Sequence, residues 1–244
     1  MIKRSRFITM IIFFILISIL NPIKSYANDR GIEGIGGTLK IIKGEHKYIQ
    51  MVSEVIKMDI YDTYYDVSVD FVFKNQSKSS QIVKMGFPEE GYGDISAPER
   101  KNKTGFTKFL TSINGKKTTA KRVLVKGGIE EFYESYWVKD VFFKANEKLN
   151  IHVEYRSKIG SAVPVDNDSI SSIFVEYNFT GGNWKGKVED SLLVANIHLS
   201  DKYKIATSDF TSTKGIKIEK NKLTYHVKNW EAQEHFAIWF KKLK

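Results

Sequence analysis

A two-residue alternation of apolar and polar side chains recurs along this chain and constrains its fold more than any other feature. In the clearest segment one strand face carries apolar residues: Tyr65, Val67, Val69, Phe71 and Phe73. The opposite face of that segment carries polar residues: Asp66, Ser68, Asp70 and Lys74. Residues 149–157 repeat the pattern, which is typical of antiparallel strands with one buried face.

Turn residues separate these strand-like segments. Asn114-Gly115 stands between two of them and predicts a tight hairpin, because a type I′ turn needs a positive φ at both central positions. A helical period of 3.6 residues never persists beyond two turns. The pattern therefore predicts an all-β protein, an antiparallel β-sandwich. Two packed sub-sandwiches, with a boundary near residues 160–169 around Pro164, are the alternative.

The N-terminal segment has the layout of a secretory signal peptide. Lys3, Arg4 and Arg6 precede an apolar run over residues 7–20, and Ser25-Tyr26-Ala27 places small residues at the cleavage positions. The run is shorter than the roughly 20 residues of a spanning helix. We expect residues 1–27 to be a cleaved signal helix, residues 28–37 a flexible glycine-rich leader and residues 38–244 the β-sandwich domain. The alternative is that the signal segment is retained as an anchor.

Composition limits the compartment and the partners. The 244 residues contain no cysteine, which excludes thiol catalysis, cysteine-based zinc sites and iron–sulfur clusters. The formal net charge is +10, yet beyond residue 27 the only arginines are Arg30, Arg100, Arg122 and Arg156. Because base readout depends on arginine, no nucleic-acid partner is expected. We predict a secreted protein, extracellular or in the cell envelope, with a cell-wall polymer or an envelope protein as partner and no stable membrane anchor after cleavage.

Two segments rich in glycine and aromatic residues are the candidate binding sites. Residues 88–100 are predicted to form a long exposed loop. Loops of this kind carry binding functions on sandwich scaffolds. The candidate binding residues of the two segments are Phe87, Glu89, Glu90, Tyr92, Asp94 and Trp184. A tryptophan exposed at position 184 would be an anchor for a sugar or a protein partner. The structural alternatives are that Phe87 fills the core and that Trp184 folds back onto the sheet.

No arrangement of residues predicts catalysis. His152 and Glu154 share a strand face, but two ligands do not make a metal site. Glu231, Glu234 and His235 do not have the spacing of a zinc-protease motif, and no serine stands in a G-x-S-x-G elbow. The acidic residues of the 88–100 loop lack the spacing of a calcium loop. We therefore expect no catalytic residues, no metal and no cofactor.

Five segments carry a resemblance to a known family: GEHKYIQMVSEV (44–55), FVFKN (71–75), MGFPEEGYGD (85–94), YWVKDVFF (136–143) and IHVEYRS (151–157). Together they resemble bacterial secreted proteins known only as a domain of unknown function, from about Gly37 to beyond Trp184. MGFPEEGYGD is the most specific of the five. The chain is also, more weakly, similar to the β-rich N-terminal domain of inter-alpha-trypsin inhibitor heavy chains. The resemblance implies secretion and a β-rich fold and assigns no activity.

These observations favour an exported, non-catalytic β-sandwich protein that binds a cell-envelope or extracellular partner. The alternative is a hydrolase acting on cell-wall glycan or peptide, with carboxylates from residues 89–99 or from Glu231 and Glu234.

Overall fold

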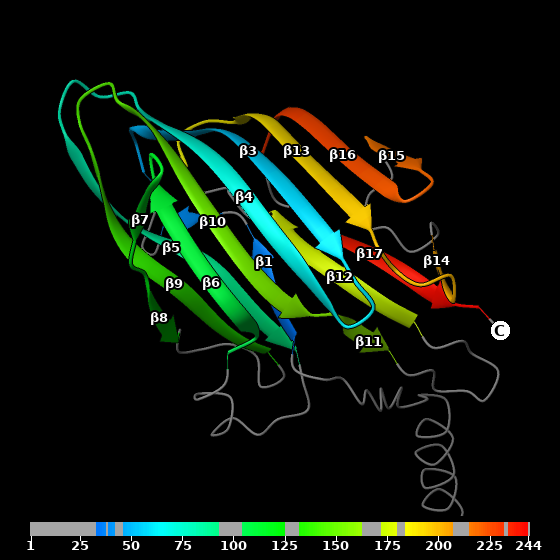
Figure 1. Cartoon of the computed structure of the whole chain (residues 1–244). Coiled ribbons are helices and arrows are strands. Elements are labelled where there is room, and N and C mark those ends of the chain that lie inside the picture. The colour runs from blue at the N-terminus through cyan, green and yellow to red at the C-terminus, as the bar shows by residue number, and fades with distance from the viewer. Residues whose placement is uncertain are drawn as a thin grey trace, which may run out of the picture.

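The computed structural model describes residues 33–37, 39–41, 46–92, 104–124, 132–162, 172–179, 184–206, 215–231 and 234–243. All regular structure in this part of the chain is β-strand, arranged in two sheets (Figure 1). No helix long and apolar enough to cross a membrane occurs among the described residues. The predicted signal helix, residues 28–32 and most of residues 160–169 lie outside them.

Among the described residues, the first sheet has nine strands. Seven form its main path, in the spatial order β14 (Tyr203–Ile205), β17 (Glu234–Lys242), β12 (Ser172–Phe179), β1 (Glu33–Gly37), β5 (Gln81–Tyr92), β9 (Phe132–Phe143) and β8 (Lys121–Leu124). The short strands β2 (Lys40–Ile41) and β11 (Gly160–Ala162) pair with β5 and β12.

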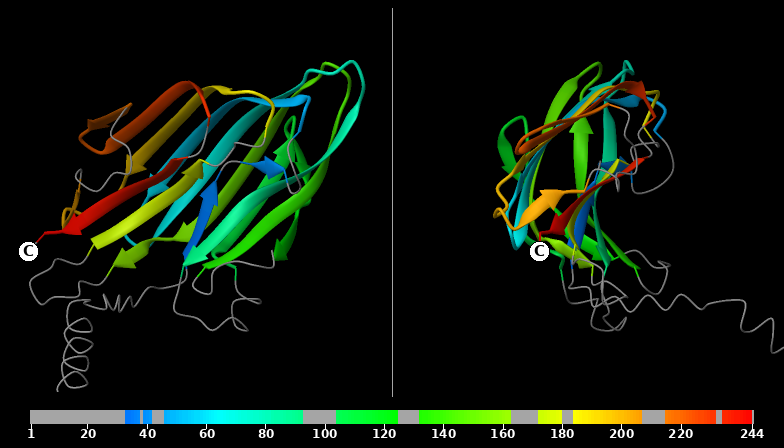
Figure 2. Two further views of the ribbon diagram at one scale, coloured as in Figure 1. Left: turned by 180° about the vertical axis from the view of Figure 1, so that it is seen from behind. Right: turned by 90° about the vertical axis from the view of Figure 1, so that its right-hand side faces the viewer.

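The second sheet has eight strands. Their spatial order is β15 (Ile216–Glu219), β16 (Lys222–Trp230), β13 (Val188–Ile197), β3 (Ile49–Ile60), β4 (Tyr64–Asn75), β10 (Lys148–Lys158), β6 (Phe106–Ile113) and β7 (Lys116–Thr118). Figure 2 shows the two sheets face to face. The predicted all-β sandwich is confirmed.

The alternating pattern decides which side chains fill the space between the sheets. Along β4, residues 65–73 alternate between buried and half-exposed positions, with the apolar residues buried. β10 follows the same rule, and both strands contribute to one continuous core with β12 and β17 of the other sheet. Burial of one large apolar side chain contributes about 1.5–3 kcal/mol, so the period-two pattern alone accounts for which face of each strand packs inward.

Two strand pairs are parallel, and they join the two halves of the chain. β13 lies parallel to β3, and β1 lies parallel to β12. Strands from before and after residues 160–169 therefore share both sheets and one core. The described residues form one sandwich rather than two packed sub-sandwiches.

Glu33–Gly37, predicted to belong to a flexible leader, is a strand between β5 and β12. Glycine is required there for a packing reason. A Cβ atom on Gly36 would lie 2.3 Å from the ring of Tyr155, which reaches across from β10. The glycines of β1 thus permit a close approach between the two sheets.

Pro88–Tyr92, predicted to begin an exposed loop, is the second half of β5. This part of the chain is strand because β9 pairs along the whole of β5, while β1 pairs with residues 90–92 on the other side. On that side the described pairing stops at Gly86 and resumes at Glu90. Pro88, which has no N–H to donate, falls in this gap.

Candidate functional site

Phe87 is a core residue. Its side chain is buried on β5, and its ring centroid lies 5.5 Å from that of Tyr155 and 5.7 Å from that of Phe109, both in the opposite sheet. The alternative role predicted for this residue, filling the core, is therefore the one the structure shows, and Phe87 cannot contact a partner directly.

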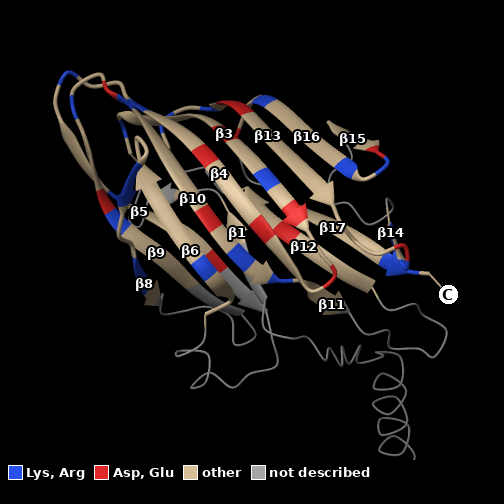
Figure 3. Cartoon of the chain, viewed as in Figure 1, with Lys and Arg blue, Asp and Glu red and all other residues tan. Residues whose placement is uncertain are grey.

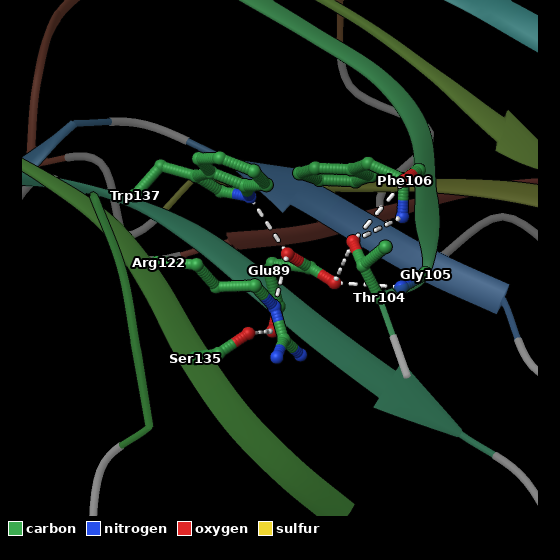
Figure 4. A network of polar contacts seen from close by, with 7 residues as sticks. All are labelled: Glu89, Thr104, Gly105, Phe106, Arg122, Ser135 and Trp137. Carbon is green, nitrogen blue, oxygen red and sulfur yellow. Dashed lines mark hydrogen bonds and ion pairs between the residues drawn. The ribbon is translucent and has the colours of Figure 1, made fainter. Parts of the chain in front are cut away.

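Glu89 is the centre of a buried polar network (Figure 4). One carboxylate oxygen, Oε1, accepts hydrogen bonds from the Thr104 hydroxyl at 2.8 Å and the Gly105 N–H at 2.6 Å. The other, Oε2, accepts from Nε of Arg122 at 3.0 Å and from Nε1 of Trp137 at 2.7 Å. Four donors therefore surround a carboxylate that has no contact with water.

This arrangement explains why a charged side chain can be buried at position 89. A buried carboxylate is tolerated when a cation and hydrogen bonds replace its hydration. The donors come from β8, from β9 and from residues 104–105, which lead into β6 of the opposite sheet. Glu89 thus joins three strands of one sheet to the start of a strand in the other.

The same geometry leaves Glu89 without the features of a catalytic acid or base. All four of its hydrogen-bond partners are donors, and no carboxylate contacts it among the described residues. The predicted exposed position of Glu89 is wrong, because β1 and β9 pair on both sides of this part of β5.

The remaining residues of the predicted loop site are only partly described. Glu90 and Tyr92 are backbone positions of β5, paired with Glu134 and Phe132 of β9, and their side chains are outside the described set. Asp94 lies outside the described residues altogether. Their predicted binding role stays a prediction.

Trp184 folds back onto the core. Its side chain is 6% exposed, its Nε1 donates to the Leu39 carbonyl at 2.7 Å, and its ring lies 4.7 Å from that of Phe73. The prediction of an exposed anchor at this position is wrong. The reason is that the indole both covers the apolar edge of β4 and satisfies a buried carbonyl of the N-terminal segment.

His152, considered as a metal ligand, is held between two carboxylates on the outer face of the second sheet. Its Nδ1 lies 2.7 Å from Asp70 and its Nε2 lies 3.2 Å from Glu154. Burial lowers the pKa of His152, but the hydrogen bonds to both carboxylates outweigh it and raise the pKa above its usual value. No group of three metal-ligating side chains occurs among the described residues.

A pocket that sequence reasoning missed lies at the open edge of the sandwich. It has a volume of about 390 Å³ and is bounded by the edge strands β14 and β15 of the two sheets, together with the end of β13 and the turn after it. Its apolar wall consists of Ile197, Leu199, Ile205, Ile218 and Phe240. Its polar lining residues are Ser200, Asp201, Tyr203, Lys204, Lys220 and Asn221.

The charge of the pocket is set by two lysines, Lys204 and Lys220, against the single carboxylate of Asp201. Neither lysine has an ion-pair partner in the part of the chain that the structure describes. Lys220 also has a positive φ of 38°, in a region that only glycine and asparagine enter readily. The two-residue turn between β15 and β16 accounts for this φ.

The sequence contains one signal for this pocket. Lys220 and Asn221 separate two short strand-like segments, and this pattern predicts a hairpin turn. The antiparallel pairing of β16 with β13 brings the turn to the end of β13. Its place beside β14 depends on the packing of the two sheets.

The family comparison covers the N-terminal part of this architecture. Residues 27–127 match the model of a domain of unknown function, DUF4424. This stretch runs from before β1 to just beyond β8 and includes Glu89. The match agrees with the resemblance to an uncharacterised β-rich family. The extension of that resemblance to Trp184 and the likeness to inter-alpha-trypsin inhibitor heavy chains stay predictions. No protein with a curated function matches the chain.

A solved structure shares the fold over a longer stretch. A Legionella pneumophila protein described as "a putative nutrient binding protein" matches with a TM-score of 0.69 and 18% identity, over 87% of this chain and 72% of the other. At this identity the match shows a common fold. An M1 zinc metallopeptidase from Deinococcus radiodurans matches with a TM-score of 0.35 and 8% identity, over 81% of this chain and 43% of the enzyme.

Proposed function

We propose that this protein is an exported, non-catalytic binding protein of the cell envelope or the cell exterior. The observation that carries the proposal is the pocket between the edge strands β14 and β15. Its volume of about 390 Å³ lies in the range of sites for small molecules, roughly 300–1,000 Å³. Five apolar and six polar residues line it, so the pocket can contact both an apolar portion and a polar group of a ligand.

The lining residues define the ligand class. Two unpaired lysines favour an anionic group, while the apolar wall favours a hydrocarbon or ring portion. The ligand is therefore a small, partly apolar carboxylate or phosphate from the envelope or the medium. Nutrient binding, the role given to the Legionella protein, is compatible with this ligand class.

A thermal-shift screen with short-chain and aromatic carboxylates and phosphate esters tests the pocket. We expect some of these compounds to raise the melting temperature of the protein, and Lys220→Asn to weaken the response about tenfold, since a lost charged contact is worth about 1.5–3 kcal/mol. Asparagine suits the positive φ, so the turn should be preserved.

Lys57→Asn is the matched control, because Lys57 is an exposed lysine of β3 outside the pocket lining. It should respond as the unmodified protein does. Equal responses of Lys220→Asn and the unmodified protein, or no response to any compound in the screen, would contradict the proposed site.

Export is supported by the signal-peptide pattern of residues 1–27. Expression in a bacterial host that secretes proteins should place the protein outside the cytoplasmic membrane, with Asn28 as its first residue. N-terminal sequencing of the exported form checks this. Recovery of the full-length chain from the membrane fraction would support the anchor alternative instead.

A further inference from the structure

We infer that one end of the sandwich, formed by residues 76–84 and 140–148 and here called the tip, docks on anionic lipid membranes. The tip comprises the β4–β5 turn, the β9–β10 turn and the adjoining ends of β5 and β9. Figure 1 shows the two turns projecting together from the same end of the molecule. This inference concerns a surface separate from the β14–β15 pocket.

The tip exposes large apolar side chains that nothing in the fold explains. Ile82 is 72% exposed and Phe142 is 55% exposed, the highest values among the large apolar residues of the described chain. The two residues are direct cross-strand partners, so they form one continuous apolar patch on the outer face of the first sheet. Adjacent exposed apolar residues of this size mark interaction sites.

Lysines outnumber acidic residues at the tip. The tip contains four lysines, Lys78, Lys84, Lys144 and Lys148, and two acidic residues, Asp140 and Glu147. Lys74, at its border, adds a further positive charge. None of these lysines forms an ion pair with another described residue. Glu147 is occupied within its own turn, where its carboxylate accepts from the Lys144 N–H at 2.6 Å. Figure 3 shows basic positions in the projecting turns, with an acidic position among them.

The two turns are locked together by a buried asparagine. The Asn75 side-chain amide donates to the carbonyls of Ser79 and Lys144, each at 2.9 Å, so that it bridges both turns. The Asn146 N–H donates to the Ser77 carbonyl at 3.1 Å and makes a second bridge. The tip is therefore preorganised, and docking requires little ordering of the chain.

This combination fits a membrane better than it fits a soluble anionic polymer. Lysines attract the phosphate groups of a lipid surface and those of a soluble polymer alike. Only a bilayer, however, offers an apolar phase for Ile82 and Phe142 to enter. The patch lies near an extremity of the molecule (Figure 1), which suits contact with a flat interface. The occupant we assign is therefore the surface of an anionic phospholipid bilayer.

Vesicle co-sedimentation tests the inference. The protein should sediment with vesicles of phosphatidylglycerol and phosphatidylcholine, and much less with phosphatidylcholine alone. Phe142→Ser and Ile82→Ser should each weaken binding about fivefold, because each removes an inserted apolar side chain. All variants keep the same N-terminal segment, so differences between them report on the tip.

Val123→Ser is the matched apolar control, since Val123 is 46% exposed on β8 of the same sheet and lies outside the tip. It should bind as the unmodified protein does. Lys78→Gln with Lys144→Gln should reduce the preference for phosphatidylglycerol, whereas Lys57→Gln should not. Phe142→Trp should keep binding and show a blue shift of its fluorescence when vesicles are added.

Two results would overturn the inference. One is binding that depends on the lysines but survives Phe142→Ser and Ile82→Ser unchanged, as expected for adsorption of a phosphate polymer. The other is absence of binding to phosphatidylglycerol vesicles by the folded protein, in which case the apolar patch has another partner. Loss of binding at the tip leaves ligand responses in the thermal-shift screen unaffected, so the two proposals fail independently.

Discussion

At the scale of single residues, the four donors around Glu89 show how burial changes the meaning of a carboxylate. In the sequence Glu89 is one of several acidic residues in a glycine-containing segment, which favours an exposed binding loop. In the structure the same carboxylate is shielded from water and shared between Arg122, Trp137 and residues 104–105. Its role is to stabilise the junction between the two sheets.

Glu89→Gln should therefore lower the free energy of unfolding by about 3 kcal/mol. The amide loses the ion pair with Arg122, whose side chain is only 17% exposed, and its NH2 group faces donors from which it cannot accept a hydrogen bond. Urea denaturation monitored by tryptophan fluorescence measures the loss.

Glu154→Gln is the matched control, because the Lys108–Glu154 pair is 48% and 38% exposed. Exposed pairs contribute about 1 kcal/mol or less. Similar losses in both variants would contradict a special role for Glu89.

At the scale of elements, the sequence predicted strands and turns well where local chemistry decides them. The Asn114-Gly115 turn is confirmed: φ is 49° at Asn114 and 76° at Gly115, and Ile113 pairs with Lys116. β1 was not predicted, because its glycines have no alternation to read. Its conformation depends on β5 and β12, which are distant in sequence.

Two glycine substitutions separate local conformation from packing. Gly115→Ala meets no atom within 4 Å, so its cost is the positive φ alone, about 1 kcal/mol. The φ of Gly36 is not in the left-handed region, so the backbone accepts alanine there. The added Cβ atom collides with the Tyr155 ring, however, and this collision should cost about 2 kcal/mol or more.

Chemical denaturation of both glycine variants gives the comparison. Gly36→Ala should also perturb the near-ultraviolet circular dichroism of the tyrosines, and Gly115→Ala should not. A larger loss in Gly115→Ala than in Gly36→Ala would contradict the proposed packing of β1 against β10.

At the scale of the whole molecule, Lys139 reaches across the space between the sheets. It is buried on β9, and its Nζ donates to the hydroxyls of Thr111 on β6 and Thr118 on β7. Burial lowers the pKa of Lys139 to about 8. No carboxylate pairs with it among the described residues, so two hydroxyl groups replace part of its hydration.

This lysine predicts a stability that rises with pH. Between pH 8 and the pKa of 10.5 of an ordinary lysine, the unfolded chain holds a proton that the folded chain has lost, so alkaline conditions favour folding. Below pH 8 the amine is charged in both the folded and the unfolded state and the full burial penalty applies, on the order of 3 kcal/mol.

Lys139→Met should be more stable than the unmodified protein at pH 7 and should lose this rise. Denaturation midpoints measured from pH 7 to 10.5 check the difference between the two proteins. If the midpoints of both proteins change with pH in the same way, the Lys139 amine is hydrated in the folded protein and the prediction is wrong. Lys57→Met, at an exposed position, controls for general lysine titration.

The alternation of Tyr65 to Phe73 and of residues 149–157 was enough to predict an all-β sandwich and the inward face of its long strands, because a period of two is a local property of the backbone. Local chemistry also settled the Asn114-Gly115 turn. The signal-peptide pattern predicts export on the same local grounds.

The tertiary structure alone decided which residues meet. It buried Glu89 and Trp184, placed the Lys220 turn against the end of β13, and brought Ile82 beside Phe142 at the tip. Each of these contacts joins segments far apart in the chain through sheet pairing or packing. Their geometry depends on strand order and register, which hydrophobic periodicity does not encode.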